Sequence, residues 1–212
     1  MTTSSSTLSI PDTRLAKEAT ELLREHSTDL LFNHSMRVYF FAAEHGHQQK
    51  RPFDRELLYV AAVFHDFGLI KKYSSADERF EVDGANLARQ FLTAHNVAEE
   101  KIRRVWQAIA LHTTPGITQH MDSEVALLYS GVGLDVLGRG FDLFPSELRE
   151  EILAAYPRRS FKTNFIHEYF AGFAHKPATT IGTVNSSFCE RLIPGYKAPN
   201  GIDLIAASPF AE

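Results

Sequence analysis

The spacing of apolar residues along the chain predicts helices over most of its length. Apolar positions recur three and four residues apart, the period of one face of an α-helix. Asp54 is placed to cap one helix, and Pro145 stands at the expected start of another. The predicted helices cover approximately residues 11–26, 28–48, 54–65, 82–96, 98–113, 122–138, 145–156 and 161–176.

Alternation with a period of two, typical of half-buried strands, is scarce. No internal repeat or linker interrupts the pattern, and 212 residues suffice for one well-formed core. We therefore expect one all-α domain over residues 11–196. The Ser/Thr-rich residues 1–10 are expected to be disordered, and residues 197–212, rich in Pro, Gly and Asn, to form an irregular tail.

Several ionisable residues occupy positions that the helical pattern turns toward the core. Each follows apolar residues of its own helix at the spacing of one face, or directly adjoins such a position. These residues are His34, His65, Asp66, His112 and Asp135. A single inward histidine is readily explained by one hydrogen bond, but a buried carboxylate without a partner costs several kcal/mol. A shared divalent cation would compensate all of them, because neutral imidazoles and ionised carboxylates are its natural ligands.

Composition excludes several other functions. The formal net charge of -4 and the absence of a basic cluster argue against a nucleic-acid surface. Cys189 is the single cysteine, which excludes an intramolecular disulfide and fits a reducing compartment. No apolar run approaches the ~20 residues of a membrane helix, and the first residues lack the features of a secretory signal. We expect a cytoplasmic protein that acts on a small molecule, with a homo-oligomer as one possible state.

The order His34, His65-Asp66, Asp135 resembles the H…HD…D pattern of the HD-domain metal-dependent superfamily. The segments "NHSMRVYFFA", "AAVFHDFGL", "ERFEVDGANLARQFL", "AIALHTTPGI", "EVALLYSGVGLDVLG" and "HKPATT" are similar to its cyanamide hydratase branch, over residues 25 to 200. The resemblance implies an all-helical HD domain with a metal site in its core. It also implies that His34, His65, Asp66 and Asp135 are the metal ligands.

The sequence departs from the dinuclear HD proteins at two points. Phe80 stands where many of them have a further histidine, and His112 is not part of a His-His pair. Both departures favour one metal ion over two, although His112 as a ligand of a second ion stays open. Zn²⁺ is the first expectation for the ion, with Fe²⁺ or Mn²⁺ as alternatives.

These expectations combine into a hydratase that adds water to a small nitrile-like substrate, converting cyanamide to urea. Asp66 would orient or deprotonate water, and His112 would protonate the nitrile nitrogen. Thr113, Glu81 and His175 are the expected substrate-binding residues. Aromatic side chains close in sequence to the ligands favour a small, neutral substrate; they are Phe32, Phe40, Phe64, Phe67 and Tyr73.

Two alternatives remain. A phosphohydrolase would use the same ion and need cations around the phosphate, for which the sequence offers Arg37, Lys71, Lys72 and Arg79. A purely structural metal site is the second alternative, but structural zinc sites are usually closed and rich in cysteine.

Overall fold

The computed structural model describes residues 8–210, and helices are its only regular secondary structure over that range. The α-helices are α1 (Arg14–His26), α2 (Asp29–Gln48), α3 (Arg55–Phe64), α4 (Phe80–Ala94), α5 (Glu99–Leu111), α6 (Ser123–Leu137), α7 (Ser146–Ala155), α8 (Phe161–Ala171), α9 (Ser186–Leu192) and α10 (Gly201–Ala206). The predicted all-α fold is confirmed.

Local capping chemistry fixes where the first helices begin. The Thr13 hydroxyl accepts from the backbone N–H of Ala16, and Thr28 caps α2 in the same way. Asp54 accepts the first free N–H groups of α3, as its sequence position predicts. The eight predicted helices all form, with ends shifted by a few residues.

Three segments differ from expectation. The stretch 68–80, which lies between two predicted helices, carries two 3₁₀ turns, Phe67–Leu69 at its start and Lys71–Tyr73 within it. The helix predicted over 161–176 ends at Ala171, and α9 was not predicted. Part of the predicted irregular tail forms α10. Most of the expected N-terminal disorder falls on residues 1–7, outside the described residues, whereas Leu8 packs against the core.

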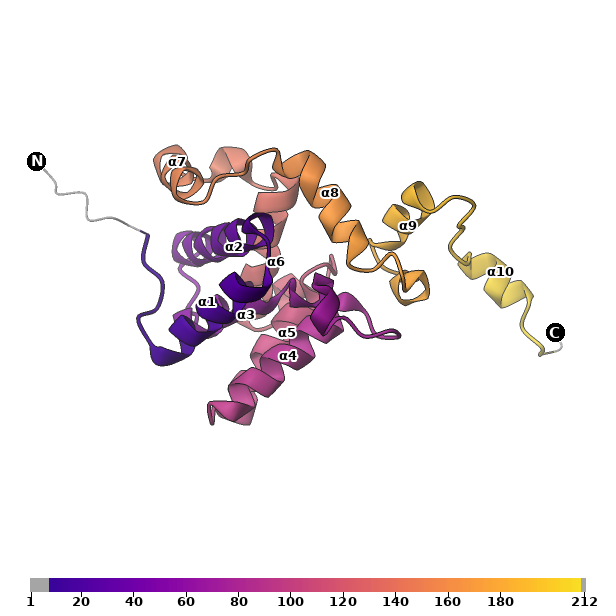
Figure 1. Ribbon diagram of the computed structural model, residues 1–212, viewed down its shortest axis with the longest axis horizontal. Coiled ribbons are helices and arrows are strands. Elements are labelled where there is room, and N and C mark those ends of the chain that lie inside the picture. Colours follow the sequence, from indigo (N-terminus) through magenta and orange to yellow (C-terminus); the bar gives the residue numbers. More distant parts are fainter. Residues whose placement is uncertain (1–7, 211–212) are drawn as a thin grey trace, which may run out of the picture.

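Helices α1 to α6 form the body of the molecule, α7 lies at the upper left, and α8 to α10 lead away from it toward the right (Figure 1). The long helix α2 is buried along most of its length and packs against α3 and α6. Gly131 makes the α2–α6 contact possible, because a Cβ there would lie 2.5 Å from the Val38 carbonyl oxygen.

The hydrophobic core has two parts, and the candidate residues His34, His65, Asp66 and His112 lie where these parts meet. The larger cluster joins α1 to α7, and the smaller one packs α8 and α9 against Leu31, Leu69 and Phe80. Gly68 brings the turn after α3 against the start of α4, since a Cβ at Gly68 would lie 1.9 Å from the Phe80 carbonyl oxygen. Within residues 8–210 no helix is long and apolar enough to cross a membrane.

Candidate metal centre

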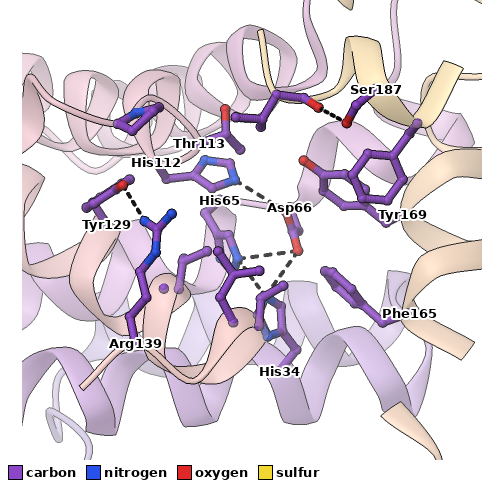
Figure 2. A pocket seen from close by; sticks show the side chains of 17 residues that line it. His34, His65, Asp66, His112, Thr113, Tyr129, Arg139, Phe165, Tyr169 and Ser187 are labelled. Atoms are coloured by element: carbon purple, nitrogen blue, oxygen red, sulfur yellow. Dashed lines mark hydrogen bonds and ion pairs between the residues drawn. The ribbon is translucent and has the colours of Figure 1, made fainter. Parts of the chain in front are cut away.

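Four of the predicted ionisable residues meet in the interior. His34 comes from the second turn of α2, His65 and Asp66 follow the last residue of α3, and His112 follows the last residue of α5. All four side chains are almost completely shielded from solvent and point toward one another (Figure 2). Because the HD pair lies at a helix end, both of its side chains reach the same point.

The hydrogen bonds on the outer side of each imidazole fix its tautomer. His34 Nδ1 lies 2.6 Å from Asp135 Oδ2, His65 Nδ1 lies 2.8 Å from the Ala62 carbonyl oxygen, and His112 Nδ1 lies 2.6 Å from the Ile109 carbonyl oxygen. These partners only accept, so each Nδ1 carries the hydrogen and, in the neutral ring, each Nε2 carries a lone pair. All three rings are therefore set up to coordinate through Nε2.

The three lone pairs converge on one carboxylate. His34 Nε2 and His65 Nε2 are 3.2 Å apart, and they lie 3.5 and 3.3 Å from Asp66 Oδ2. His112 Nε2 lies 3.6 Å from Asp66 Oδ1. Both Asp66 oxygens are buried without a hydrogen-bond partner. Lone pairs and carboxylate oxygens repel one another unless a proton or a metal cation lies between them.

These residues fit a divalent cation. One donor atom each from His34, His65 and Asp66 lie within 4.8 Å of one another, and imidazole nitrogen with carboxylate oxygen is a common ligand set. In the metal-free protein burial would raise the pKa of the Asp66 carboxyl, but the positive charge of the His65 ring, when that ring is protonated, outweighs it and keeps that pKa well below its ordinary value. The carboxylate is therefore held in the ionised form that a metal requires.

Asp135 lies on the other side of His34, and its carboxylate is fully bonded by the protein. Oδ2 receives His34 Nδ1 and Arg37 Nη2, and Oδ1 receives Arg37 Nε at 2.8 Å and Arg158 Nη1 at 2.6 Å. In this arrangement Asp135 orients His34, and its role as a direct ligand stays a prediction. Arg37, which the sequence offered for phosphate binding, instead forms a hydrogen-bonded ion pair with Asp135.

The predicted substrate-binding residues occupy three different environments. Thr113 lines the cavity, and its hydroxyl donates to Glu81 Oε1 at 2.5 Å. Glu81 is buried outside the cavity lining, where it also receives Arg79 and the Asn185 amide. Burial would raise the pKa of the Glu81 carboxyl, but the Arg79 hydrogen bond outweighs it and lowers that pKa. His175 is exposed beside Ser74 and Ser75 and does not line the cavity.

A cavity of about 210 Å³ opens over the converging donor atoms. Its wall contains residues that sequence reasoning missed: Tyr129, Val132, Val136, Leu137, Arg139, Phe165, Tyr169, Val184, Ser187 and Phe188. Apolar side chains dominate, and the one cationic side chain of the lining, Arg139, donates to the Tyr129 hydroxyl (Figure 2). The stretch "LLYSGVGLDVLGR" gave a helical signal for these positions but none for the direction of the cavity.

Comparison with protein families identifies the chain. The HD domain family matches residues 31–154, more than half of the chain, from α2 through α7. A search of curated proteins gives no significant match. The matched range includes His34, the His65-Asp66 pair, His112 and Asp135, whereas α8 and α9, which complete the cavity wall, follow it. The chain therefore belongs to the HD-domain family, and this membership together with the buried His/Asp cluster identifies a metal-dependent hydrolase fold.

Proposed function

We propose that the protein hydrates a small, neutral, nitrile-like molecule such as cyanamide, giving urea in that case. The observation that carries the proposal is the combination of a small apolar cavity with the converging imidazoles and the Asp66 carboxylate at its floor. The wider activity, metal-dependent addition of water, follows from the family. The nitrile substrate is inferred from the size and polarity of the cavity and from the sequence resemblance.

The cavity favours a small substrate over a nucleotide. Its volume of about 210 Å³ is below the roughly 300–1,000 Å³ typical of sites for larger ligands. Val132, Val136, Phe165 and Phe188 in its wall offer no hydrogen bonds to a sugar or a base. A linear nitrile needs few polar partners besides those at its reacting end.

The side chains at the cavity floor suit the two proton transfers of hydration. His34, His65 and Asp66 would hold the ion, which when bound lowers the pKa of water toward ~7. An Asp66 oxygen would orient that water and pass its proton on to His112 Nε2, which lies 3.6 Å from Asp66 Oδ1, so that the ring is protonated again for each turnover. Attack on the nitrile carbon forms a C–O bond and breaks a C–N π bond, and the nitrogen then needs a proton. His112, fixed through Nδ1, would deliver it from Nε2 in its protonated form, and the resulting imidic acid tautomerises to the amide.

Thr113 would bind the substrate directly, and Glu81 would act through it. Because its hydroxyl donates to Glu81, its oxygen still has a lone pair free to accept a hydrogen bond. The amino group of cyanamide is a suitable donor. Glu81 would act by holding Thr113 in place and would not touch the substrate.

Hydrolysis of a phosphate ester is the competing proposal, favoured by Arg139 in the cavity wall. The guanidinium would approach a phosphate oxygen only after leaving the Tyr129 hydroxyl. The other expected cations are poorly placed for this reaction. Arg37 is bonded to Asp135, Arg79 to Glu81, and Lys72 is exposed outside the lining, as is Lys71.

Elemental analysis of the purified protein, followed by assays with cyanamide, other small nitriles and nucleoside monophosphates, tests the proposal. Urea formation that disappears when a chelator removes the metal supports it. Phosphate release without any action on cyanamide would replace it with the competing reaction.

A His112→Ala variant separates the proton donor from the ligands. We expect an unchanged metal content and turnover lowered by about 10²–10⁴. His120→Ala is the matched control, because His120 is exposed and outside the cavity lining. Loss of metal from the His112 variant would make it a ligand, and unchanged turnover would remove it from the mechanism.

A further inference from the structure

The C-terminal arm, residues 197–210, leaves the body of the protein with its apolar side chains uncovered. Every residue from Pro199 to Phe210 is exposed, and the arm projects away from the other helices (Figure 1). Its large apolar side chains are exposed to an unusual degree: Ile202 by 76%, Leu204 by 60%, Ile205 by 78% and Phe210 by 87%. Apolar residues concentrated on a projecting helix indicate a surface that is covered in the functional state.

A groove beside α7, separated from the arm by α8 and α9, has apolar walls and a basic rim that complement the arm. A cavity of about 300 Å³ lies between the C-terminal end of α6 and the start of α8, beside α7. Its apolar lining includes Phe41, Leu134, Phe141 and Leu153. Leu137 and Phe141, both exposed, extend the apolar surface to its edge.

The charges of the arm and the groove are also complementary. Arg149, Arg158 and Lys162 line the groove, and its one carboxylate, Asp135, is already bonded by Arg158 and Arg37. Lys162 is exposed and has no ion pair among the described residues. The arm carries Asp203 on its helix and no Lys or Arg beyond Lys197.

In one copy α8 and α9 separate the arm from the groove, so their pairing fits two copies better than one. The chain is held to the body at Tyr196, whose hydroxyl donates to the Pro177 carbonyl oxygen, and α10 begins only five residues later. Figure 1 shows α10 on the far side of the molecule from α7. If two identical copies exchange their arms, the arm and the groove of each copy are both covered, and the result is a closed, two-fold symmetric dimer.

We propose that the C-terminal arm of one copy docks into the α6–α8 groove of a second copy, forming an arm-exchanged homodimer. Ile202 and Ile205, three residues apart on one face of α10, enter the apolar groove, and Asp203 meets the basic rim at Lys162. The groove also contains Arg158, which bonds the carboxylate that orients His34. The docked arm therefore covers a side chain only two contacts away from the metal centre.

Light scattering on the full-length, metal-loaded protein at micromolar concentration tests the proposal. We expect a dimer for the wild type and a monomer for the double variant Ile202→Ser/Ile205→Ser, with metal content and circular dichroism unchanged. Ile117→Ser is the matched control, because Ile117 is an exposed apolar residue outside the arm and the groove, and it should remain dimeric. A monomeric wild type, or a double variant that dimerises like the wild type, would overturn the proposal.

Charge exchange tests whether this groove is the docking site. Asp203→Lys and Lys162→Glu should each weaken the dimer by at least about tenfold, and the combined variant should regain it. A mixture of Asp203→Cys and Lys162→Cys proteins should also form a disulfide-linked heterodimer, while neither protein alone does so; Cys189, buried in both, provides the background. Failure of both the rescue and the cross-link would show that the arm binds elsewhere.

Discussion

Asp66 and Asp135 are two buried aspartates on either side of the His34 ring, and they differ in how far the protein compensates their charge. Asp135 is bonded by His34, Arg37 and Arg158, so its charge is balanced by fixed side chains. Asp66 faces only imidazole nitrogens and has no hydrogen-bond partner. Equal burial with unequal compensation leaves the oxygens of Asp66, and not those of Asp135, without a partner in the protein.

The largest effect should come from the unpartnered carboxylate. Asp66→Ala removes a donor atom that lies with those of His34 and His65. We expect metal content to fall below one ion per chain and turnover to fall by about 10⁴. Elemental analysis and steady-state assays measure both quantities. An Asp66→Ala variant that keeps its metal content and its turnover would show that Asp66 is not needed for metal binding or catalysis.

Asparagine at each position should affect the stability of the metal-free protein in opposite directions. Asp135→Asn leaves the buried Arg37 guanidinium without its counter-charge and should lower the free energy of unfolding by about 3 kcal/mol. At alkaline pH, where the His65 ring is neutral, Asp66→Asn should raise it, because an amide N–H can donate to the Nε2 lone pairs that the carboxylate repels. Chemical denaturation in the presence of a chelator measures both, and equal changes of the same sign would contradict the comparison.

A smaller effect is expected from the outer arginine. Arg158→Gln removes hydrogen bonding to Asp135 while Arg37 remains bonded to it. The His34 ring should therefore be held less rigidly but keep its position. Metal affinity should fall about tenfold, at the low end of the effect of residues that orient ligands. Competition with a chelating dye measures the affinity. The exposed Arg159 is not bonded to Asp135 and, as Arg159→Gln, provides the control.

The smallest effect should appear at acid pH. Burial would raise the pKa of the Asp135 carboxyl, but the hydrogen bonds from His34 and Arg37 outweigh it and hold that pKa well below 3.8. A depressed folded-state pKa stabilises the protein above the unfolded-state pKa, and this contribution is lost as the pH falls below about 4. The difference in unfolding free energy between wild type and Asp135→Asn should therefore narrow between about pH 4 and pH 2. A constant difference would show that the charge of Asp135 is not what stabilises the fold.

Much of the metal centre was predictable because helical periodicity is local. His34, His65 and Asp66 occupy or adjoin core-facing positions of their own helices, and burial forces such positions together. The hydrogen bonding of Asp135 was not predictable. Its partner Arg158 lies in a turn next to two residues with positive φ, Arg159 and Ser160, and periodicity says nothing of where such a turn points.

The cavity wall and the last helix show the same limit. The inward direction of Phe165 and Tyr169 depends on how α8 packs against the body, which no local pattern encodes. The tail composition suggested irregular chain, yet Asn200 caps α10 by accepting the N–H of Ile202. That cap was the available signal for the helix.

Two stretches of chain form the cavity, and each supplies a different part of it. The helical body supplies every nitrogen and oxygen at its floor, and the segment from Phe165 to Phe188 supplies one side of its wall. Substitutions in that segment can therefore reshape what enters without replacing any of the nitrogens and oxygens at the floor. Substrate range in this protein is thus free to diverge, by selection or by engineering, while the chemistry beneath stays the same.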